Sequence, residues 1–96
     1  MILIYKGAKL FNQDISDWDV SNVTNMSKMF FEASSFNQNI SDWDVSHVGS
    51  MWQMFHGAAS FNQDISSWEV SNETDLKYMF DGADSYTYGL PQRMGE

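Results

Sequence analysis

One phrase of sequence returns three times in this chain at a fixed interval of 25 residues. It starts at Phe11, Phe36 and Phe61, where it reads FNQDISDWDVSNV, FNQNISDWDVSHV and FNQDISSWEVSNE. A repeat of this length does not bury an apolar face alone, so neighbouring repeats must stack to share a core. The repetition therefore predicts a short solenoid within a single domain.

The register of the repeat divides the 96 residues into five segments. Residues 11–35, 36–60 and 61–85 are full repeats, residues 1–10 align with the second part of a repeat, and residues 86–96 depart from the pattern. We expect the last segment to form a C-terminal cap. The apolar start of the chain, MILI, is the reverse of a polar cap, so self-association through an uncapped N-terminal coil is a second expectation.

Two apolar spacings adjoin inside each repeat. Trp18 and Val20 alternate with polar residues, which predicts a short half-buried strand. Apolar residues recur at intervals of three and four over residues 23–33, which predicts a short helix, and Gly57 and Gly82 would end its later copies. The expected fold class is an α/β repeat, a right-handed solenoid of 25-residue strand–turn–short-helix units with a short parallel sheet.

The segment FNQDISDWDVSNVTNMSKMFFEA resembles the repeat of the BspA-like leucine-rich-repeat family, found in bacterial surface lipoproteins of unknown function. The W-D-V-S-x-V segment, the M-F pair and the F-N-Q phrase carry the resemblance, which covers residues 11–85 well and residues 1–10 in part. It implies a leucine-rich-repeat-like solenoid, an extracellular or cell-surface setting, and a role in adhesion or partner binding. It brings no catalytic residues with it.

The composition argues against several classes of function. The chain has 13 acidic and 5 basic residues, for a net charge of −8, whereas nucleic-acid binding needs a basic stripe. It has no cysteine for disulfides or thiolate metal sites and no apolar run long enough for membrane insertion. The first ten residues lack the basic leader and cleavage site of a signal peptide.

Carboxylates recur in two neighbouring slots of the repeat. We expect them on the outer face of the predicted strands, as an acidic strip that contacts a partner. A solvated strip is favoured over a calcium site, and no metal or cofactor is predicted. The residues concerned are Asp17, Asp19, Asp42, Asp44 and Glu69.

The repetition of these carboxylates also argues against an enzyme. A glycosidase needs two carboxyl groups in different environments, with pKa values pushed apart, at one place. Identical groups in every repeat do not provide that asymmetry. A hydrolase is therefore the least favoured function.

Two further sets of residues are expected to build the core and its rim. Trp18, Trp43 and Trp68 alternate with acidic residues and should point inward, although tryptophans could also stack on a sugar. The asparagine and glutamine of each FNQ phrase should pair with their equivalents in the next repeat.

One group of residues breaks the symmetry of the repeat. Trp52 and His56 are four residues apart and would share a helix face, and Phe31 occupies the His56 slot one repeat earlier. Together they could form a contact patch, or they could be unrelated surface aromatics, and the sequence favours neither.

The favoured function is a non-catalytic repeat module that presents a binding surface for protein or glycan partners within a cell-surface or secreted protein. The alternative is a structural spacer or a self-associating array segment.

Overall fold

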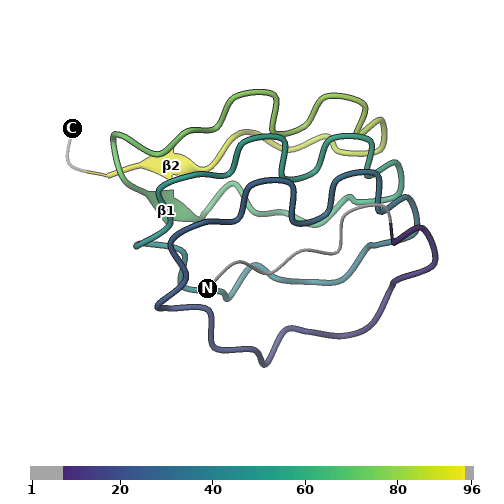
Figure 1. Ribbon diagram of the computed structural model, residues 1–96, viewed down its shortest axis with the longest axis horizontal. Helices are drawn as coiled ribbons and strands as arrows, with labels where there is room; N and C mark the ends of the chain where they lie inside the picture. Colours follow the sequence, from purple (N-terminus) through teal and green to yellow (C-terminus); the bar gives the residue numbers. More distant parts are fainter. Residues whose placement is uncertain (1–7, 95–96) are drawn as a thin grey trace.

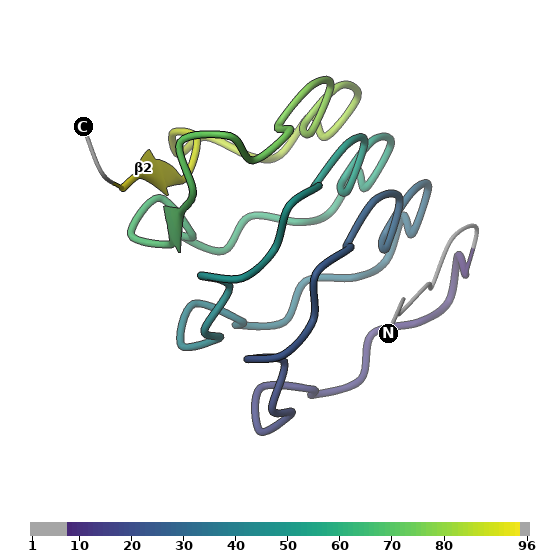
Figure 2. The same ribbon diagram turned by 60° about the vertical axis from the view of Figure 1, so that its left-hand side comes forward.

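The three repeats lie beside one another in sequence order in a computed structural model, which describes residues 8–94 (Figure 1). Each repeat is one circuit of the chain. In each circuit one segment rises into two adjacent crests, and the crests of the later repeats follow in the same direction (Figure 2). The crests of the first repeat comprise residues 26–33.

Successive β-turns shape each circuit. Within the first repeat, five N–H groups donate hydrogen bonds of 2.9–3.2 Å to the carbonyl three residues earlier, namely those of Trp18, Val23, Met29, Phe31 and Ala33. The crest turns run from Met26 to Met29 and from Phe30 to Ala33, and these four end residues are completely buried. The two central residues of each crest turn reach the surface.

The crest turns require a left-handed backbone. The third residue of each has a positive φ between 54° and 75°: Lys28, Glu32, Gln53, Gly57, Tyr78 and Gly82. A positive φ at this position, with a hydrogen bond across the turn, is the pattern of a type II turn. Gly57 and Gly82 therefore occupy turn positions that favour glycine and do not end helices.

Backbone hydrogen bonds join the crests of neighbouring repeats. Alternate N–H groups of the first repeat donate to backbone carbonyl oxygens of the second at 2.6–2.9 Å. The donor and acceptor residues are Met26 and Ser50, Lys28 and Trp52, Phe30 and Met54, and Glu32 and His56. The second repeat donates to the third at 2.7–3.1 Å: Met51 to Asp75, Gln53 to Lys77, Phe55 to Met79 and Gly57 to Asp81. Bonds inside turns alternate with bonds to the next repeat, so this backbone is satisfied without regular secondary structure.

The C-terminal segment is held against the third repeat by a small sheet. Strands β1 (Glu69–Val70) and β2 (Gln92–Arg93) pair in parallel. The backbone N–H groups of Gln92 and Met94 donate to the carbonyl oxygens of Trp68 and Val70, both at 2.7 Å. The guanidinium of Arg93 donates to three carbonyl oxygens at 2.9–3.1 Å, those of Ser71, Asn72 and Thr74.

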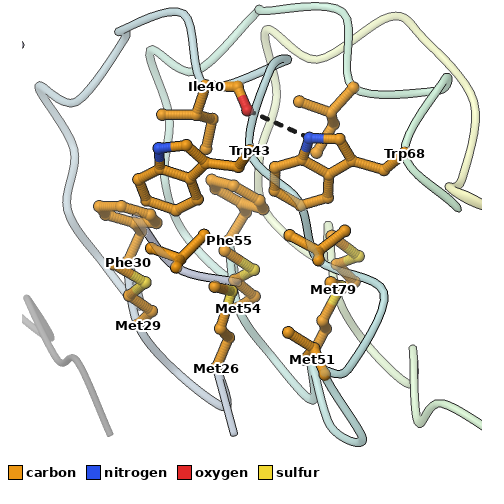
Figure 3. Close-up of a cluster of buried hydrophobic side chains, with 14 of the residues drawn as sticks. Met26, Met29, Phe30, Ile40, Trp43, Met51, Met54, Phe55, Trp68 and Met79 are labelled. Carbon is orange, nitrogen blue, oxygen red and sulfur yellow. Dashed lines mark hydrogen bonds between the residues drawn. The ribbon is translucent and has the colours of Figure 1, made fainter. Parts of the chain in front are cut away.

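The core is built from residues at equivalent positions of the repeats, which lie side by side (Figure 3). The ring of Phe55 stacks on Phe30 at a centroid distance of 5.4 Å and on Phe80 at 5.6 Å. A second column joins Phe36 to Phe61 at 5.9 Å, and the two columns touch because Phe30 and Phe36 are 4.0 Å apart. Buried methionines fill the space beside the rings.

The expectation of an α/β solenoid of strand–turn–short-helix units is wrong. Residues 8–94 contain no helix, and their one sheet has two strands instead of a strand from every repeat. The two crest turns replace the helix expected over residues 23–33. The first and fourth residues of each crest turn point inward, so consecutive turns reproduce the three-and-four apolar spacing of a helix.

Two of the three tryptophans form the expected inward column. Trp43 and Trp68 are 5% and 2% exposed, and their rings stack at 6.4 Å. Each indole N–H donates at 3.1 Å to a carbonyl of the preceding repeat, that of Ile15 or of Ile40. Trp18 is 38% exposed, so the expectation that all three are buried is wrong for the first repeat.

The amide side chains of the FNQ phrases pair between repeats as expected. Asn12 Oδ1 accepts from the backbone N–H of Asn37 at 2.8 Å and from Gln38 Nε2 at 3.0 Å. Asn37 Oδ1 accepts in the same way from Asn62 and Gln63, at 2.9 and 3.0 Å. The three asparagines lie at the surface, so these bonds align the edges of the repeats outside the core.

Candidate binding surface

The acidic residues of the expected strip are all exposed, but most lie at turns. Asp17, Asp19, Asp42 and Asp44 belong to no strand, and Glu69 begins β1. Figure 2 shows these corners at the end of each repeat opposite the crests. The prediction that a regular strand face carries the strip is therefore wrong.

Several of these carboxylates have a local structural role. Asp19 Oδ1 accepts from the N–H of Ser21 at 3.0 Å and from its hydroxyl at 2.6 Å, and Asp44 makes the same two bonds to Ser46. Such a bond to the N–H two residues on is an Asx-turn. Asn39 makes the same pair of bonds to Ser41 at 3.0 and 2.7 Å, so the turn needs an oxygen acceptor and not a charge.

The same hydrogen bonds control the ionisation of these carboxyl groups. The hydroxyl of Ser21, followed by its backbone N–H, lowers the pKa of Asp19, and partial desolvation and the charge of Asp44 oppose that shift. The hydroxyl and N–H of Ser46 likewise lower the pKa of Asp44. The acidic corners are therefore stabilised as anions by their own turns.

Neither a metal site nor a membrane span is found in the part of the chain that the structure describes. No three His, Cys, Asp or Glu side chains among residues 8–94 are grouped so that they could hold a metal ion. Nothing in that range forms an apolar helix of the length that a bilayer requires.

The crests bring together the three aromatic residues whose contact the sequence left open. The rings of Phe31 and His56 stack at 4.7 Å with an angle of 11° between their planes. Lys28 Nζ lies 5.2 Å from the centroid of Phe31 and 4.8 Å from that of Trp52, so it joins the two rings. We call Lys28, Phe31, Trp52 and His56 the crest cluster. All four side chains are half-buried.

The crest cluster is positioned by turns, and the helix face expected for Trp52 and His56 does not exist. Trp52 is the second residue of the first crest turn of its repeat, and His56 is the second residue of the next turn. Their side chains point outward because the turn ends, Met51, Met54 and Phe55, are buried.

Contacts within the crest cluster are of a kind that stabilises a surface. An ammonium group over an aromatic ring contributes about 0.5–1 kcal/mol at exposed sites and more when it is desolvated. His56 Nδ1 is the one side-chain polar atom in the described residues that is buried without a hydrogen-bond partner. The cluster is therefore preformed and amphipathic, with a cation held over two rings.

The crest face is also the part of the surface where the repeats differ in chemistry. Its outward slots hold Ser27, Trp52 and Lys77 in one column, Lys28, Gln53 and Tyr78 in the next, and Phe31, His56 and Asp81 in a third. The twelve slots that are identical in all three repeats include the buried Phe, Ile, Met and Ala positions. The invariant apolar slots thus form most of the core, the invariant Asn and Gln slots join neighbouring repeats at the surface, and the crests carry what can distinguish one partner from another.

Lys28 is the member of the crest cluster that sequence reasoning missed. It lies three residues before Phe31, and the N–H of Phe31 donates to the Lys28 carbonyl at 3.2 Å. Its column, Lys28, Gln53 and Tyr78, is as variable as that of Trp52. That variability was the feature of the sequence that could have identified Lys28 as a candidate surface residue.

Comparison with known proteins gives one family. No curated protein and no solved structure matches this sequence. The model of a family described as "Mycoplasma protein of unknown function, DUF285" matches residues 1–92, which include all three repeats and most of the C-terminal segment. The chain therefore belongs to the DUF285 family.

Proposed function

We propose that this chain is a non-catalytic repeat module that binds a protein partner through the crest cluster. The observation that carries the proposal is the cluster itself: Lys28, Phe31, Trp52 and His56 form one preformed surface on the variable slots of the repeat. Aromatic residues are enriched at protein interfaces, and tryptophan is among the residues that most often dominate their energetics. The carboxylates recur as acceptors in turns, and this supports the non-catalytic part of the proposal.

A protein suits this surface better than a glycan does. Sugars stack on open aromatic faces, whereas His56 covers one face of Phe31 and Lys28 lies over Trp52. A partner would contact ring edges and the lysine, which favours mixed apolar and acidic side chains on the other protein.

The proposal includes a cell-surface or secreted setting. It rests on the likeness of the F-N-Q, W-D-V-S and M-F phrases to the BspA-like leucine-rich-repeat family of surface lipoproteins. Protease treatment of intact cells that express the protein tests it. Loss of the repeat segment from intact cells is expected, and full protection that persists until lysis would contradict a surface location.

The binding role is tested by selecting partners from a displayed peptide library with the wild-type chain as bait. Peptides that bind are expected to lose about tenfold or more in affinity for Trp52→Ala, since truncation of a central interface aromatic costs about 2 kcal/mol or more. Lys28→Gln should weaken binding while leaving the rings in place.

The matched control is the double variant Asp17→Asn and Asp42→Asn, which changes two exposed residues outside the crest turns. It changes exposed side chains without touching the crests and is expected to leave affinity unchanged. Selected peptides that respond to this variant and ignore Trp52→Ala would refute the assignment of the crest cluster. Binding of the chain to glycans on an array, if lost in Trp52→Ala, would show that the crest cluster binds a sugar and not a protein.

A further inference from the structure

The first crest turns of the three repeats lie side by side and form one surface. The backbone N–H of Lys28 donates to the Trp52 carbonyl at 2.9 Å, and the N–H of Gln53 donates to the Lys77 carbonyl at 3.1 Å. The two central residues of each turn reach the surface, so together they make a row that crosses all three repeats. We call this surface the first-crest row, and it consists of Ser27, Lys28, Trp52, Gln53, Lys77 and Tyr78.

The first-crest row is basic, although the chain as a whole is acidic. It contains two of the five basic residues, Lys28 and Lys77, and no acidic residue, in a chain with a net charge of −8. The second crest turns carry the opposite charge, because Glu32 and Asp81 are exposed at their central positions. Positive charge is therefore concentrated along the first crest.

The two lysines of the row are held by rings and not by carboxylates. Lys28 Nζ lies 4.8 Å from the ring centroid of Trp52, and Lys77 Nζ lies 5.5 Å from that of Tyr78. Neither ammonium group forms an ion pair within residues 8–94. Both charges are therefore available to acidic groups of a partner.

The spacing of the lysines restricts what can reach both of them. Two repeat steps separate Lys28 from Lys77, with Trp52 in the repeat between them. Hydrogen-bonded neighbouring segments lie about 4.8 Å apart, so the two lysine backbones are separated by roughly 10 Å. A peptide in the polyproline II conformation spans about 9 Å over three residues, and side chains three positions apart lie on one side of it.

We propose that the partner presents an acidic segment to the first-crest row. Two carboxylates three residues apart pair with Lys28 and Lys77, and an apolar side chain near them packs on Trp52. This inference rests on the proposed function, because it names the chemistry of the partner for the same surface and extends that surface to the third repeat. Glu32 and Asp81 of the second crest repel such a segment and so confine it to the first.

The probe is the displayed peptide library, selected on the wild-type chain. The selected peptides are expected to contain pairs of Asp or Glu three positions apart, with an apolar residue close to them. Their binding should weaken as the salt concentration rises, because exposed ion pairs are screened. Selected peptides that lack acidic residues, or that bind equally at all salt concentrations, would overturn the proposal.

A charge exchange tests the pairing with Lys77, which is exposed and lies outside the crest cluster. Lys77→Glu is expected to weaken the selected peptides about fivefold, because attraction becomes repulsion at one contact. Replacing the acidic residues of a peptide by lysine, one at a time, should then yield one peptide that binds the variant better than it binds the wild type. If no such exchange restores binding, the pairing is wrong.

A carboxylate beside the row provides a variant that should bind more tightly. Asp75 Oδ1 accepts from the backbone N–H of Lys77 at 2.9 Å, and Asn25 makes the same bond to Ser27 in the first repeat. Asp75→Asn should therefore keep the turn, remove a repelling charge and strengthen acidic peptides about twofold. Asp42→Asn removes the same charge from an exposed residue outside the crest turns and should leave affinity unchanged. Equal affinities of the two variants would contradict the proposal.

These measurements separate the inference from the proposed function. Loss of binding in Trp52→Ala together with full affinity in Lys77→Glu would retain the crest cluster as the binding surface and overturn the acidic segment. Binding that is unchanged in both variants, or a library that yields no binding peptide, would overturn both. A sedimentation mass that rises above 11.0 kDa with concentration, and does not rise in Lys77→Glu, would assign the row to a second copy of the chain and overturn the assignment to a different protein.

Discussion

At the scale of single residues, the backbone of the crests matters as much as the side chains. Lys28, Gln53 and Tyr78 hold φ values of 57°, 54° and 58°, in the left-handed region that residues with a Cβ rarely adopt. The bonds between repeats hold these turns in place. The second crest turn has glycine at this position in two repeats and Glu32 in the first, with a φ of 57°.

Glu32→Gly is expected to raise the free energy of unfolding by about 0.5–1 kcal/mol. The left-handed conformation costs roughly 1–2 kcal/mol for a residue with a Cβ, and the greater freedom of glycine in the unfolded chain offsets part of this gain. Urea denaturation measures the change.

Gly57→Ala is the converse variant and should destabilise the chain, because its φ is 72° and a Cβ there would lie 3.1 Å from Glu32 Cγ. If Glu32→Gly lowers stability, the contacts of the Glu32 side chain outweigh its backbone strain, and the argument from φ fails.

The acidic corners belong to the same scale and predict a pH dependence. Hydrogen bonds from Ser46 lower the pKa of Asp44 below the ordinary value of 3.8, so its contribution to stability is present above that pH and is lost as the pH falls below it. Asp44→Asn should preserve the turn, as Asn39 does, and reduce the loss of stability in acid.

Denaturation at a series of pH values checks this expectation. Asp42→Asn is the matched control, since it removes the same charge from an exposed residue that takes no part in an Asx-turn bond. An equal effect of both variants on the acid dependence would contradict the role assigned to the Ser46 bonds.

At the scale of structural elements, the repeat works as a set of columns. Each column places one kind of side chain beside its equivalents, and the tryptophan column adds a hydrogen bond from each buried indole to the preceding repeat. A repeat is therefore stabilised mainly by its neighbours, and substitutions in a column act on two interfaces at once.

Trp43→Ala should lower the free energy of unfolding by about 3–5 kcal/mol, because it empties a buried site between two repeats. The loss would be a large part of the ~5–15 kcal/mol that stabilises a typical domain. Trp18→Ala, at the same slot but 38% exposed, is the control and should cost clearly less. Equal losses of stability for Trp43→Ala and Trp18→Ala in urea denaturation would contradict the expectation that the buried tryptophan contributes more than the exposed one.

At the scale of the whole molecule, the C-terminal segment covers one side of the last repeat. The C-terminal segment covers one part of the third repeat with β2, and it places Tyr86 on Phe80 at 3.9 Å. The hydroxyl of Tyr86 donates to the Gly89 carbonyl at 2.6 Å. The crest N–H groups of Leu76, Tyr78, Phe80 and Gly82 meet no backbone acceptor within residues 8–94, so the described chain covers the third repeat on one side only.

The C-terminal segment predicts a loss of stability in alkali. Burial, followed by the charge of Asp64 and the proximity of Tyr88, raises the pKa of Tyr86 from 10.0 to about 12. Its contribution to stability is therefore complete below pH 10 and is lost as the pH rises from 10 towards about 12.

Tyr86→Phe should flatten this alkaline decline in denaturation experiments. Tyr78→Phe, which makes the same chemical change at a ring that is 49% exposed and is not among the causes of the Tyr86 pKa shift, is the matched control. A decline that persists unchanged in Tyr86→Phe would show that another group controls it.

Much of the arrangement followed from the sequence, because a fixed period places equivalent residues together. The inward column of Trp43 and Trp68 and the pairing of the FNQ amides were predicted in this way. The meeting of Phe31 with His56 was also open to prediction, since the two share a slot. The inward prediction failed for Trp18, whose repeat lies nearest the N-terminal end of the described chain.

The sequence alone determined the 25-residue period, the slots that form the core and the membership of the DUF285 family. Only the tertiary structure decided between helices and turns, because both bury residues three and four apart. That choice depends on bonds between residues 24 positions apart, which hold Lys28 and Gln53 in a left-handed conformation that their own side chains disfavour. The same bonds place Lys28 over Phe31 and Trp52.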